Sequence, residues 1–198
     1  MGKVPNEKED DAVDGKLRNM TAIYLRCMEG MVMLYRMGSR VVGNSYTGAA
    51  GGHFEQDELN EPKACVLREL QEETGLTEND IENLAMRYVT LRLKNGEIRQ
   101  NYYFFADLSQ AVLERWGLAE GGRYEGAVAE RKPIVLDGIS SNEGRLEWVP
   151  IEKVLELEMP ASAKHMMQHY LAVGMNTDAV YGGVSTVAGA EFVELQEF

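Results

Sequence analysis

Three glutamates crowd one face of a predicted helix. Glu69, Glu72 and Glu73 stand in the stretch RELQEETGL, and at about 100° per residue of an α-helix they fall within an arc of about 100°. Like charges at these spacings repel by about 0.2–0.5 kcal/mol per pair, and no lysine is placed to relieve them. Two interpretations follow: a solvated acidic face, or a site where a hard divalent cation such as Mg²⁺ or Mn²⁺ neutralises the carboxylates.

The helix that must position these carboxylates has recognisable ends. Asn60 is the expected N-cap, Glu61 and Pro62 suit a first turn, and Gly75 is the expected left-handed stop. Arg68 can pair with only part of the acidic cluster. On the side away from the glutamates, apolar residues form the stripe that we expect to pack against the core: Ala64, Val66, Leu67 and Leu70.

The stretch from Gly51 to Leu76 resembles the Nudix box, whose pattern is G-x5-E-x7-R-E-U-x-E-E-x-G-U with U aliphatic. Gly52 matches the first glycine and Glu58 the loop glutamate. The second half matches without a gap, at Arg68, Glu69, Leu70, Glu72, Glu73, Gly75 and Leu76. One departure is plain, because nine residues rather than seven separate Glu58 from the arginine. The longer connection puts the role of Glu58 in question more than the roles of the helix carboxylates, which lie in the half that matches without a gap.

The resemblance implies a fold and a reaction class. The fold is of the α/β class, a Nudix-type α/β/α sandwich around a mixed β-sheet. The reaction is hydrolysis of a nucleoside diphosphate linked to another moiety X, with Mg²⁺ or Mn²⁺ as cofactor. The implied metal ligands are Glu69, Glu72, Glu73 and the carbonyl of Gly51. Arg68 would orient the cluster through charge-assisted contacts, and Glu69 is the leading candidate for the general base.

A further glutamate outside the box is expected to complete the metal site. In triphosphate-cleaving members of the resembling family, such a residue often lies on a loop shortly before the strand that leads into the last helix. Glu143 in Asn142-Glu143-Gly144 has this position, just before RLEWV. An ordinary surface turn is the alternative interpretation, and Glu125 and Glu130 are rival candidates.

The substrate is approached through the sequence beyond the box. The stretches MLYRMGSRVVG, GGHFE and LRLKNGEIRQNYYFF resemble the branch of oxidised-purine nucleoside triphosphatases, which are 8-oxo-dGTP diphosphatases. This implies a purine nucleoside triphosphate cut to monophosphate and pyrophosphate, with Arg36, Tyr46 and Thr47 as candidate substrate-binding residues. Two alternatives stay open: a pyrophosphatase of the ADP-ribose type, and a non-catalytic nucleotide-binding regulator.

Composition sets limits on partners and location. The chain has 198 residues and a net charge of −12, which argues against a general nucleic-acid or membrane-surface binder. We therefore expect a small nucleotide as the partner, and the sequence does not give the oligomeric state. Two cysteines form no disulfide framework or zinc spacing, so we expect a cytoplasmic protein. Residues 1–16 are expected to be a flexible leader and 17–198 a single domain.

The remaining elements follow from periodicity and turn signals. Strands are expected at 18–27, 31–37, 84–94, 97–108 and 145–149, with Asn95-Gly96 as a hairpin turn and 39–50 as a loop. The aromatic run Tyr102 to Phe105 is expected to be at least half core. Helices are expected at 150–157 and 161–173, the second with His165 and His169 on its surface, and an extra hairpin at 180–195 ends the chain. Residues 106–142 are expected to be an elaborated connection, either a lid or a surface insertion.

Overall fold

The computed structural model describes residues 15–37, 44–141 and 143–197. Most of the expected leader and part of the expected loop at 39–50 lie outside these residues. The last leader residue, Lys16, is already tied to the fold, because its carbonyl accepts a hydrogen bond from the Ile98 amide at 2.9 Å and its ammonium pairs with Glu97 at 3.2 Å. No helix in the described ranges is long and apolar enough to cross a membrane.

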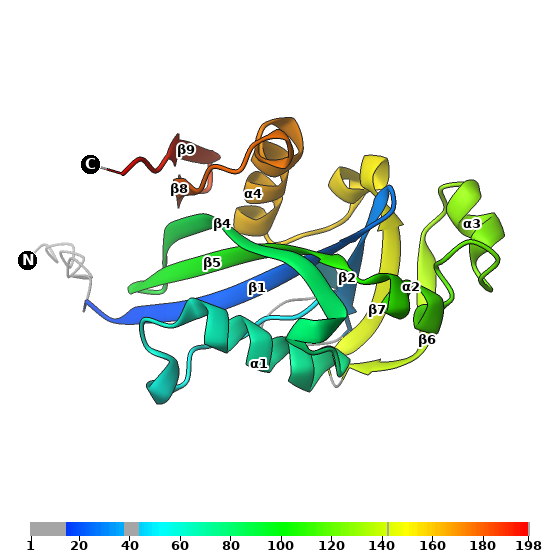
Figure 1. Cartoon of the computed structure of the whole chain (residues 1–198). Coiled ribbons are helices and arrows are strands. Elements are labelled where there is room, and N and C mark those ends of the chain that lie inside the picture. Colours follow the sequence, from blue (N-terminus) through cyan, green and yellow to red (C-terminus); the bar gives the residue numbers. More distant parts are fainter. Residues whose placement is uncertain (1–14, 38–43, 142, 198) are drawn as a thin grey trace, which may run out of the picture.

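A mixed nine-stranded sheet forms the middle of the molecule (Figure 1). Its order is β6-β7-β2-β1-β5-β4-β8-β9, with β3 also paired to β2. Pairing is parallel between β1 and β5 and between β4 and β8, and antiparallel elsewhere. The strands are β1 (Leu17–Cys27), β2 (Gly30–Arg36), β3 (Ser45–Gly48), β4 (Ile81–Lys94), β5 (Glu97–Leu108), β6 (Ile134–Ser141), β7 (Gly144–Pro150), β8 (Tyr181–Ser185) and β9 (Ala190–Glu194).

Helices cover both faces of this sheet, which gives the three layers of an α/β/α sandwich (Figure 1). On one face α1 (Pro62–Thr74) packs through Val66 and Leu70, joined by α2 (Gln110–Trp116) and α3 (Glu125–Ala129). On the other face α4 (Ala161–Ala172) packs through Met166, Met167 and Tyr170. Four 3₁₀ turns complete the described elements: η1 (Gln56–Glu58), η2 (Glu78–Asp80), η3 (Ile151–Glu156) and η4 (Gly174–Asn176). The expected fold class is confirmed.

The ends of α1 correct one detail of the sequence analysis. The N-cap is Glu61 rather than Asn60, which instead takes a left-handed turn with φ 73° one residue earlier. Pro62 begins the helix and Gly75 ends it with φ 72°, as expected. The buried face is Cys65, Val66, Leu70 and Glu73, whereas Ala64 is exposed. The packing stripe is therefore rotated towards one glutamate, which becomes part of the buried face.

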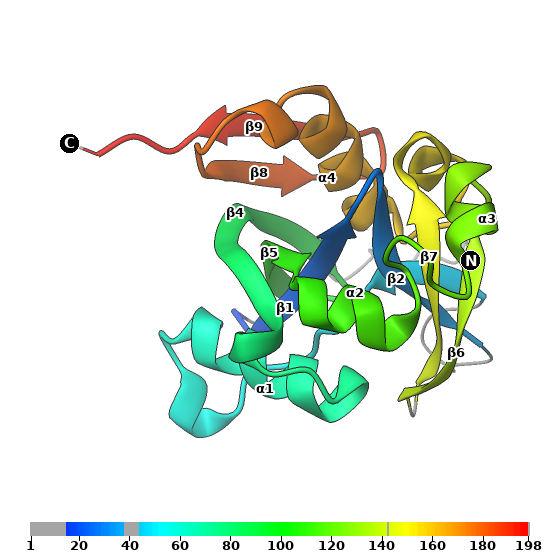
Figure 2. The same ribbon diagram turned by 45° about the vertical axis from the view of Figure 1, so that its right-hand side comes forward.

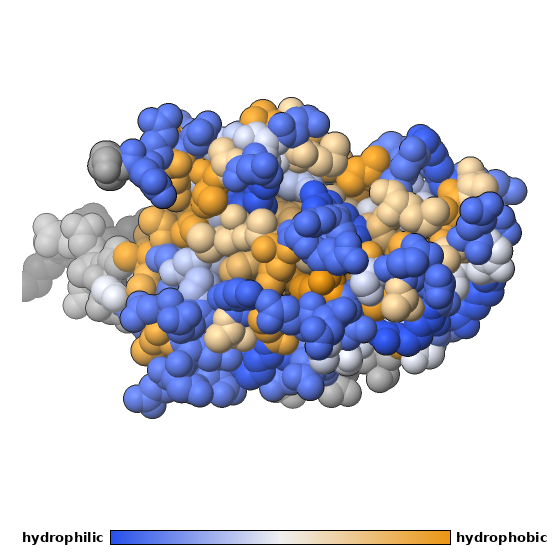
Figure 3. Space-filling view, in the orientation of Figure 1, coloured by the Kyte–Doolittle hydropathy of each residue, from blue (hydrophilic) through white to orange (hydrophobic). Residues whose placement is uncertain are grey.

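The central hairpin agrees with its sequence signals. Asn95 (φ 54°) and Gly96 (φ 73°) form the tight turn between β4 and β5. Tyr103, Phe104 and Phe105 are buried, and Tyr102 is half-buried beside Phe54 with ring centroids 5.4 Å apart. On the face shown in Figure 3, apolar residues gather over this region between α1 and α4, and the lower rim along α1 is hydrophilic.

Other expectations needed correction. Ser45–Gly48 lies in the expected loop but forms a strand, β3, because its backbone pairs with the end of β2. The C-terminal hairpin is present, and β8 pairs with β4 so that it extends the main sheet beside α4 (Figure 2). His165 and His169 are half-buried rather than on the surface, because this hairpin covers them. His169 also lies 2.8 Å from the Tyr88 hydroxyl.

Candidate active site

Gly51 and Gly52, at the start of the Nudix box, form a turn that is closely packed between β1 and α1. The Thr21 amide donates to the Gly52 carbonyl at 2.8 Å, which holds the turn against β1. A Cβ atom on Gly51 would overlap the Thr21 carbonyl oxygen and lie 2.7 Å from the Ala22 Cα. A Cβ atom on Gly52 would overlap the carboxylate of Glu69 on the other side. Glycine is therefore required at Gly51 for backbone packing, and at Gly52 it leaves room for the Glu69 carboxylate in its present position.

Arg68 organises the acidic face of α1. Its Nε and Nη2 lie 2.6 and 2.9 Å from the two carboxylate oxygens of Glu58, a bidentate pair. Its Nη1 lies 2.9 Å from Glu69 and 3.0 Å from Glu72, and its Nη2 also donates to the His53 carbonyl at 3.1 Å. The hydrogen bonds from this guanidinium lower the pKa of Glu58 to about 2. Glu58 is buried and contacts Arg68 although the connection between them has nine residues rather than seven.

Glu73 lies at the buried end of the cluster, next to the exposed side chain of Glu143. Glu73 is only 9% exposed and accepts a hydrogen bond from the Gly51 amide at 3.0 Å. Burial, followed by a hydrogen bond with the Glu143 carboxyl and its charge, raises the pKa of Glu73 to about 8. Burial also raises the pKa of Glu69. The raised pKa of Glu73 favours its protonated form, which avoids like-charge repulsion with the Glu143 carboxyl group.

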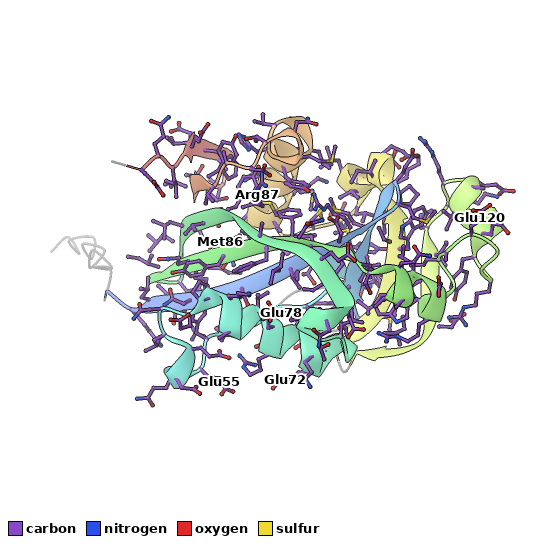
Figure 4. All side chains as sticks on the ribbon, viewed as in Figure 1. Glu55, Glu72, Glu78, Met86, Arg87 and Glu120 are labelled. Atoms are coloured by element: carbon purple, nitrogen blue, oxygen red, sulfur yellow. The ribbon has the colours of Figure 1, made fainter. Side chains whose placement is uncertain are left out.

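The structure thus brings Glu143 next to the carboxylates of α1, which the sequence analysis expected only through the resemblance. Glu143 reaches the cluster from the turn between β6 and β7, and Arg36 at the end of β2 pairs with it. Glu72 is the most exposed member, with 59% of its side chain accessible (Figure 4). In the described part of the chain, the rivals Glu125 and Glu130 make no contact with these carboxylates. They lie on α3 and at its end, where Glu130 pairs with Lys132.

The donor set suits a hard divalent cation. All of its side-chain donors are carboxylate oxygens, and these are the ligands that Mg²⁺ and Mn²⁺ prefer. Within residues 15–37, 44–141 and 143–197, no three ligating side chains converge closely enough to hold a metal ion as they stand. Binding a metal ion would therefore require these carboxylates to move closer together, and Glu73 to lose the proton that its raised pKa favours.

The expected substrate-binding residues divide between the two faces of the sheet, as alternation along a strand requires. Arg36 lies on the α1 side with Glu143, and Thr47 pairs with Leu34 of the core on that side. Tyr46 lies on the α4 side, where its hydroxyl donates to Glu147 at 2.8 Å and its ring lies 4.9 Å from that of Tyr35. The three residues do not form one cluster.

The sequence analysis missed a polar group around Tyr46. Glu147 is buried, and its carboxylate pairs with Arg145 at 2.5 Å, while the Arg145 guanidinium lies 4.8 Å from the Tyr35 ring centre. Burial, followed by the hydrogen bond to Glu147, raises the pKa of Tyr46 to about 12. The sequence RLEWV, in which charged residues alternate with apolar ones, could have indicated a buried charge. The tyrosines that complete the group come from β2 and β3, which RLEWV does not reveal.

A cavity of about 880 Å³ lies at the C-terminal end of α1. The elaborated connection supplies its far wall with Arg115, Arg123 and Asp137, and Glu72 is part of its near wall. The guanidinium of Arg115 pairs with Asp80 at 3.1 Å, and that of Arg123 donates to the Asp137 carbonyl at 3.0 Å. The connection at 106–142 therefore borders the acidic cluster.

Comparison with known proteins agrees with this geometry. The family model of the NUDIX domain matches residues 16–170. The chain belongs to the Nudix family. It is a Nudix hydrolase, and its substrates are of the nucleoside diphosphate-linked class on which this family acts. No curated protein matches the sequence.

Solved structures share the Nudix fold at low sequence identity. The MutT protein from Bacillus halodurans has a TM-score of 0.57 at 19% identity, covering 88% of this chain and 97% of its own. The MutT protein from Methanosarcina mazei has a TM-score of 0.52 at 18% identity, covering 81% and 97%. The Ap4A hydrolase of C. elegans has a TM-score of 0.51 at 13% identity, covering 82% and 99%. These similarities show the fold alone and leave the substrate open.

Proposed function

We propose that this Nudix hydrolase cleaves a purine nucleoside triphosphate, oxidised purines included, to the monophosphate and pyrophosphate in a metal-dependent reaction. The observation that carries the metal-dependent part of the proposal is the grouping of Glu69, Glu73 and Glu143 around the Gly51-Gly52 turn. A surface helix with a merely solvated acidic face would not bury Glu73 or bring a glutamate from a distant turn to it.

Each residue of the cluster has a proposed role. Glu69, Glu72, Glu73, Glu143 and the Gly51 carbonyl would hold Mg²⁺ or Mn²⁺. When bound, the cation would neutralise phosphate oxygens and lower the pKa of a water molecule. Glu69 would accept the proton of the attacking water, because its carboxylate is half-buried and fixed between Gly52 and the guanidinium of Arg68.

Arg68 would act by positioning. Its bidentate pair with buried Glu58 fixes the guanidinium, leaving Nη1 to orient Glu69 and Glu72. Arg36 and Thr47 would face the phosphate side of the substrate, and Tyr46 the nucleoside side, because the first two lie on the α1 side of the sheet and Tyr46 lies on the other. The partner would thus be one small nucleotide. Two free buried thiols, Cys27 and Cys65, accord with action in the reducing cytoplasm.

The cavity beside Glu72 favours a second candidate function. Its volume of about 880 Å³ exceeds what a phosphate group needs, and it borders a proposed metal ligand. A nucleoside diphosphate linked to a bulky X, as in ADP-ribose, could place X there. The non-catalytic alternative is not retained, because the chain is a hydrolase.

A substrate panel tests both candidates. Release of phosphate or pyrophosphate is measured with Mg²⁺ and with excess chelator for 8-oxo-dGTP, dGTP and ADP-ribose. The first proposal expects the highest kcat/KM for the triphosphates, with 8-oxo-dGTP preferred, and no turnover in chelator. A higher value for ADP-ribose would establish the second candidate instead. Turnover that persists in excess chelator would refute the proposed metal dependence.

A further inference from the structure

A second cavity, of about 430 Å³, lies on the opposite side of the sheet from α1. It is enclosed by the bulged first half of β4, by Phe105 and Tyr170, and by the segment 174–178 that follows α4. Its polar lining consists of Arg26, Asn83, Arg87, Asn176, Thr177 and Asp178. None of these residues belongs to the acidic cluster or to the cavity beside Glu72.

The lining of this cavity contains two guanidinium groups, of which that of Arg26 is paired with Asp107. Its ionisable residues, tyrosine aside, are two arginines and one aspartate, whereas the whole chain carries a net charge of −12. A concave site with two guanidinium groups concentrates the field on an anion, and guanidinium geometry suits oxyanions such as phosphate and carboxylate.

One of the two guanidiniums is rigidly placed. Arg26 Nη2 and Nε each lie 2.8 Å from an oxygen of Asp107, and Nη1 donates to the Tyr170 hydroxyl at 3.3 Å. The Asn83 amide donates to the same aspartate at 2.8 Å and so fixes this arrangement from β4. Arg26 is thus held in place at the cavity wall before any ligand arrives.

The other guanidinium is poorly neutralised. Arg87 is only 8% exposed, and its Nη2 donates to the Gly174 carbonyl at 2.9 Å (Figure 4). Its acidic partner is Asp178, 3.2 Å from Nη1, whose own side chain is fully exposed to solvent. The buried Nε has no hydrogen-bond partner in the described part of the chain. Exposed carboxylates contribute little to such a pair, whereas a buried cation requires good compensation.

A purely structural role explains only part of this arrangement. Arg87 does fasten the segment after α4 to β4, and a cation also suits the C-terminal end of a helix. That role accounts for Nη2, but it does not require a second arginine or the open volume between them. An oxyanion seated in the cavity would replace the exposed Asp178 carboxylate at Nη1.

We propose that this cavity binds a small phosphate-bearing molecule between Arg26 and Arg87, in a site separate from the acidic cluster of α1. The amides of Asn83 and Asn176 and the hydroxyl of Thr177 lie in the same lining and add donors for phosphate oxygens. The volume lies in the range of ligand-binding cavities and admits more than a single phosphate group.

The test is equilibrium binding in EDTA, which keeps divalent cations from bringing phosphate to α1. Calorimetry on the full chain uses inorganic phosphate, pyrophosphate and AMP in turn. We expect saturable binding of at least one probe. Asp178→Asn should tighten it roughly two- to fivefold, because the competing carboxylate is lost. Arg87→Gln should weaken it roughly tenfold or more. Arg131→Gln, which removes an equal charge outside both cavities, should leave it unchanged.

The strongest-binding probe identifies the phosphate source that the cavity accepts. Should Arg87→Gln fail to fold, Asp178→Asn decides, since its exposed side chain is not needed for packing. The proposal is overturned if neither wild type nor Asp178→Asn binds any probe, or if Arg131→Gln weakens binding as much as Arg87→Gln. No turnover is measured, so the result is independent of the proposed function.

Discussion

Adding one methyl group at Gly52 should separate activity from stability. In Gly52→Ala the new Cβ would lie 2.6 Å from Glu69 Oε2 and still closer to Oε1. Nonbonded heavy atoms prefer about 3.5 Å or more, so the carboxylate must retreat by about 1 Å. A shift of this size in a reacting group costs about 10²-fold in rate, or about 2.7 kcal/mol of activation free energy. We therefore expect kcat to fall about a hundredfold.

The same substitution should hardly change thermal stability. The obstructed atoms stand at the end of a flexible side chain, which can rotate away, and alanine loses less backbone entropy on folding than glycine. Gly51→Ala is the contrasting variant, because its Cβ would meet the backbone of Thr21 and Ala22. That clash cannot be relieved by rotation, so we expect a loss of about 2–3 kcal/mol in the free energy of unfolding.

Gly126→Ala on α3 is the matched control, since nothing lies within 4 Å of its added Cβ. All three variants are compared by kcat at saturating Mg²⁺ on whichever substrate the wild type hydrolyses, and by thermal unfolding in EDTA. The control should match the wild type in kcat. If Gly52→Ala keeps kcat within twofold of the wild type, catalysis does not depend on the position of the Glu69 carboxylate beside the turn. The reasoning would also be refuted if Gly52→Ala lost kcat and its thermal stability fell as much as that of Gly51→Ala.

Three further variants test the other members of the cluster. Glu72→Gln keeps the size and removes the charge, so kcat should fall by about two orders of magnitude or more with unchanged thermal unfolding; wild-type turnover would contradict its role. Glu143→Gln should lower kcat and raise the Mg²⁺ concentration for half-maximal rate, and an unchanged metal titration would exclude it as a ligand. Glu58→Gln should lose about 2–3 kcal/mol of stability, because the Arg68 guanidinium loses its buried bidentate carboxylate partner. The pKa of Glu58 is lowered to about 2, so this difference from the wild type should be full above pH 4.5 and should vanish as the pH falls towards 2. Urea unfolding across that range measures it, and a difference independent of pH would refute the pairing.

Features encoded within a few residues were predictable from the sequence. Pro62 and Gly75 mark the ends of α1 because their backbone preferences are local, and Asn95-Gly96 specifies a tight turn for the same reason. The position of Glu143 beside Glu73 was expected only through the family resemblance. No local rule places a turn between β6 and β7 next to a helix seventy residues earlier.

Features that depend on distant partners were not predictable. Ser45–Gly48 has no alternating apolar pattern and becomes a strand only because β2 offers it an edge. The buried state of Glu147 depends on Tyr46, which lies on β3 and reaches it through the pairing of β3 and β7 with β2. His169 looked like a surface residue because its cover, the β8–β9 hairpin, joins the sheet by a parallel pairing with β4. In each case the deciding contact lies far away in the chain.

The charge balance of the cluster connects these observations. In the described part of the chain, two guanidiniums contact its carboxyl groups: Arg68 contacts three and Arg36 contacts one, while Glu73 receives only a backbone amide and a carboxyl partner. The cluster holds five carboxyl groups, and burial of Glu73 beside another of them raises its pKa to about 8. The five are Glu58, Glu69, Glu72, Glu73 and Glu143. A divalent cation bound here would favour the ionised form of Glu73, which is why these carboxylates suit a metal-dependent hydrolase.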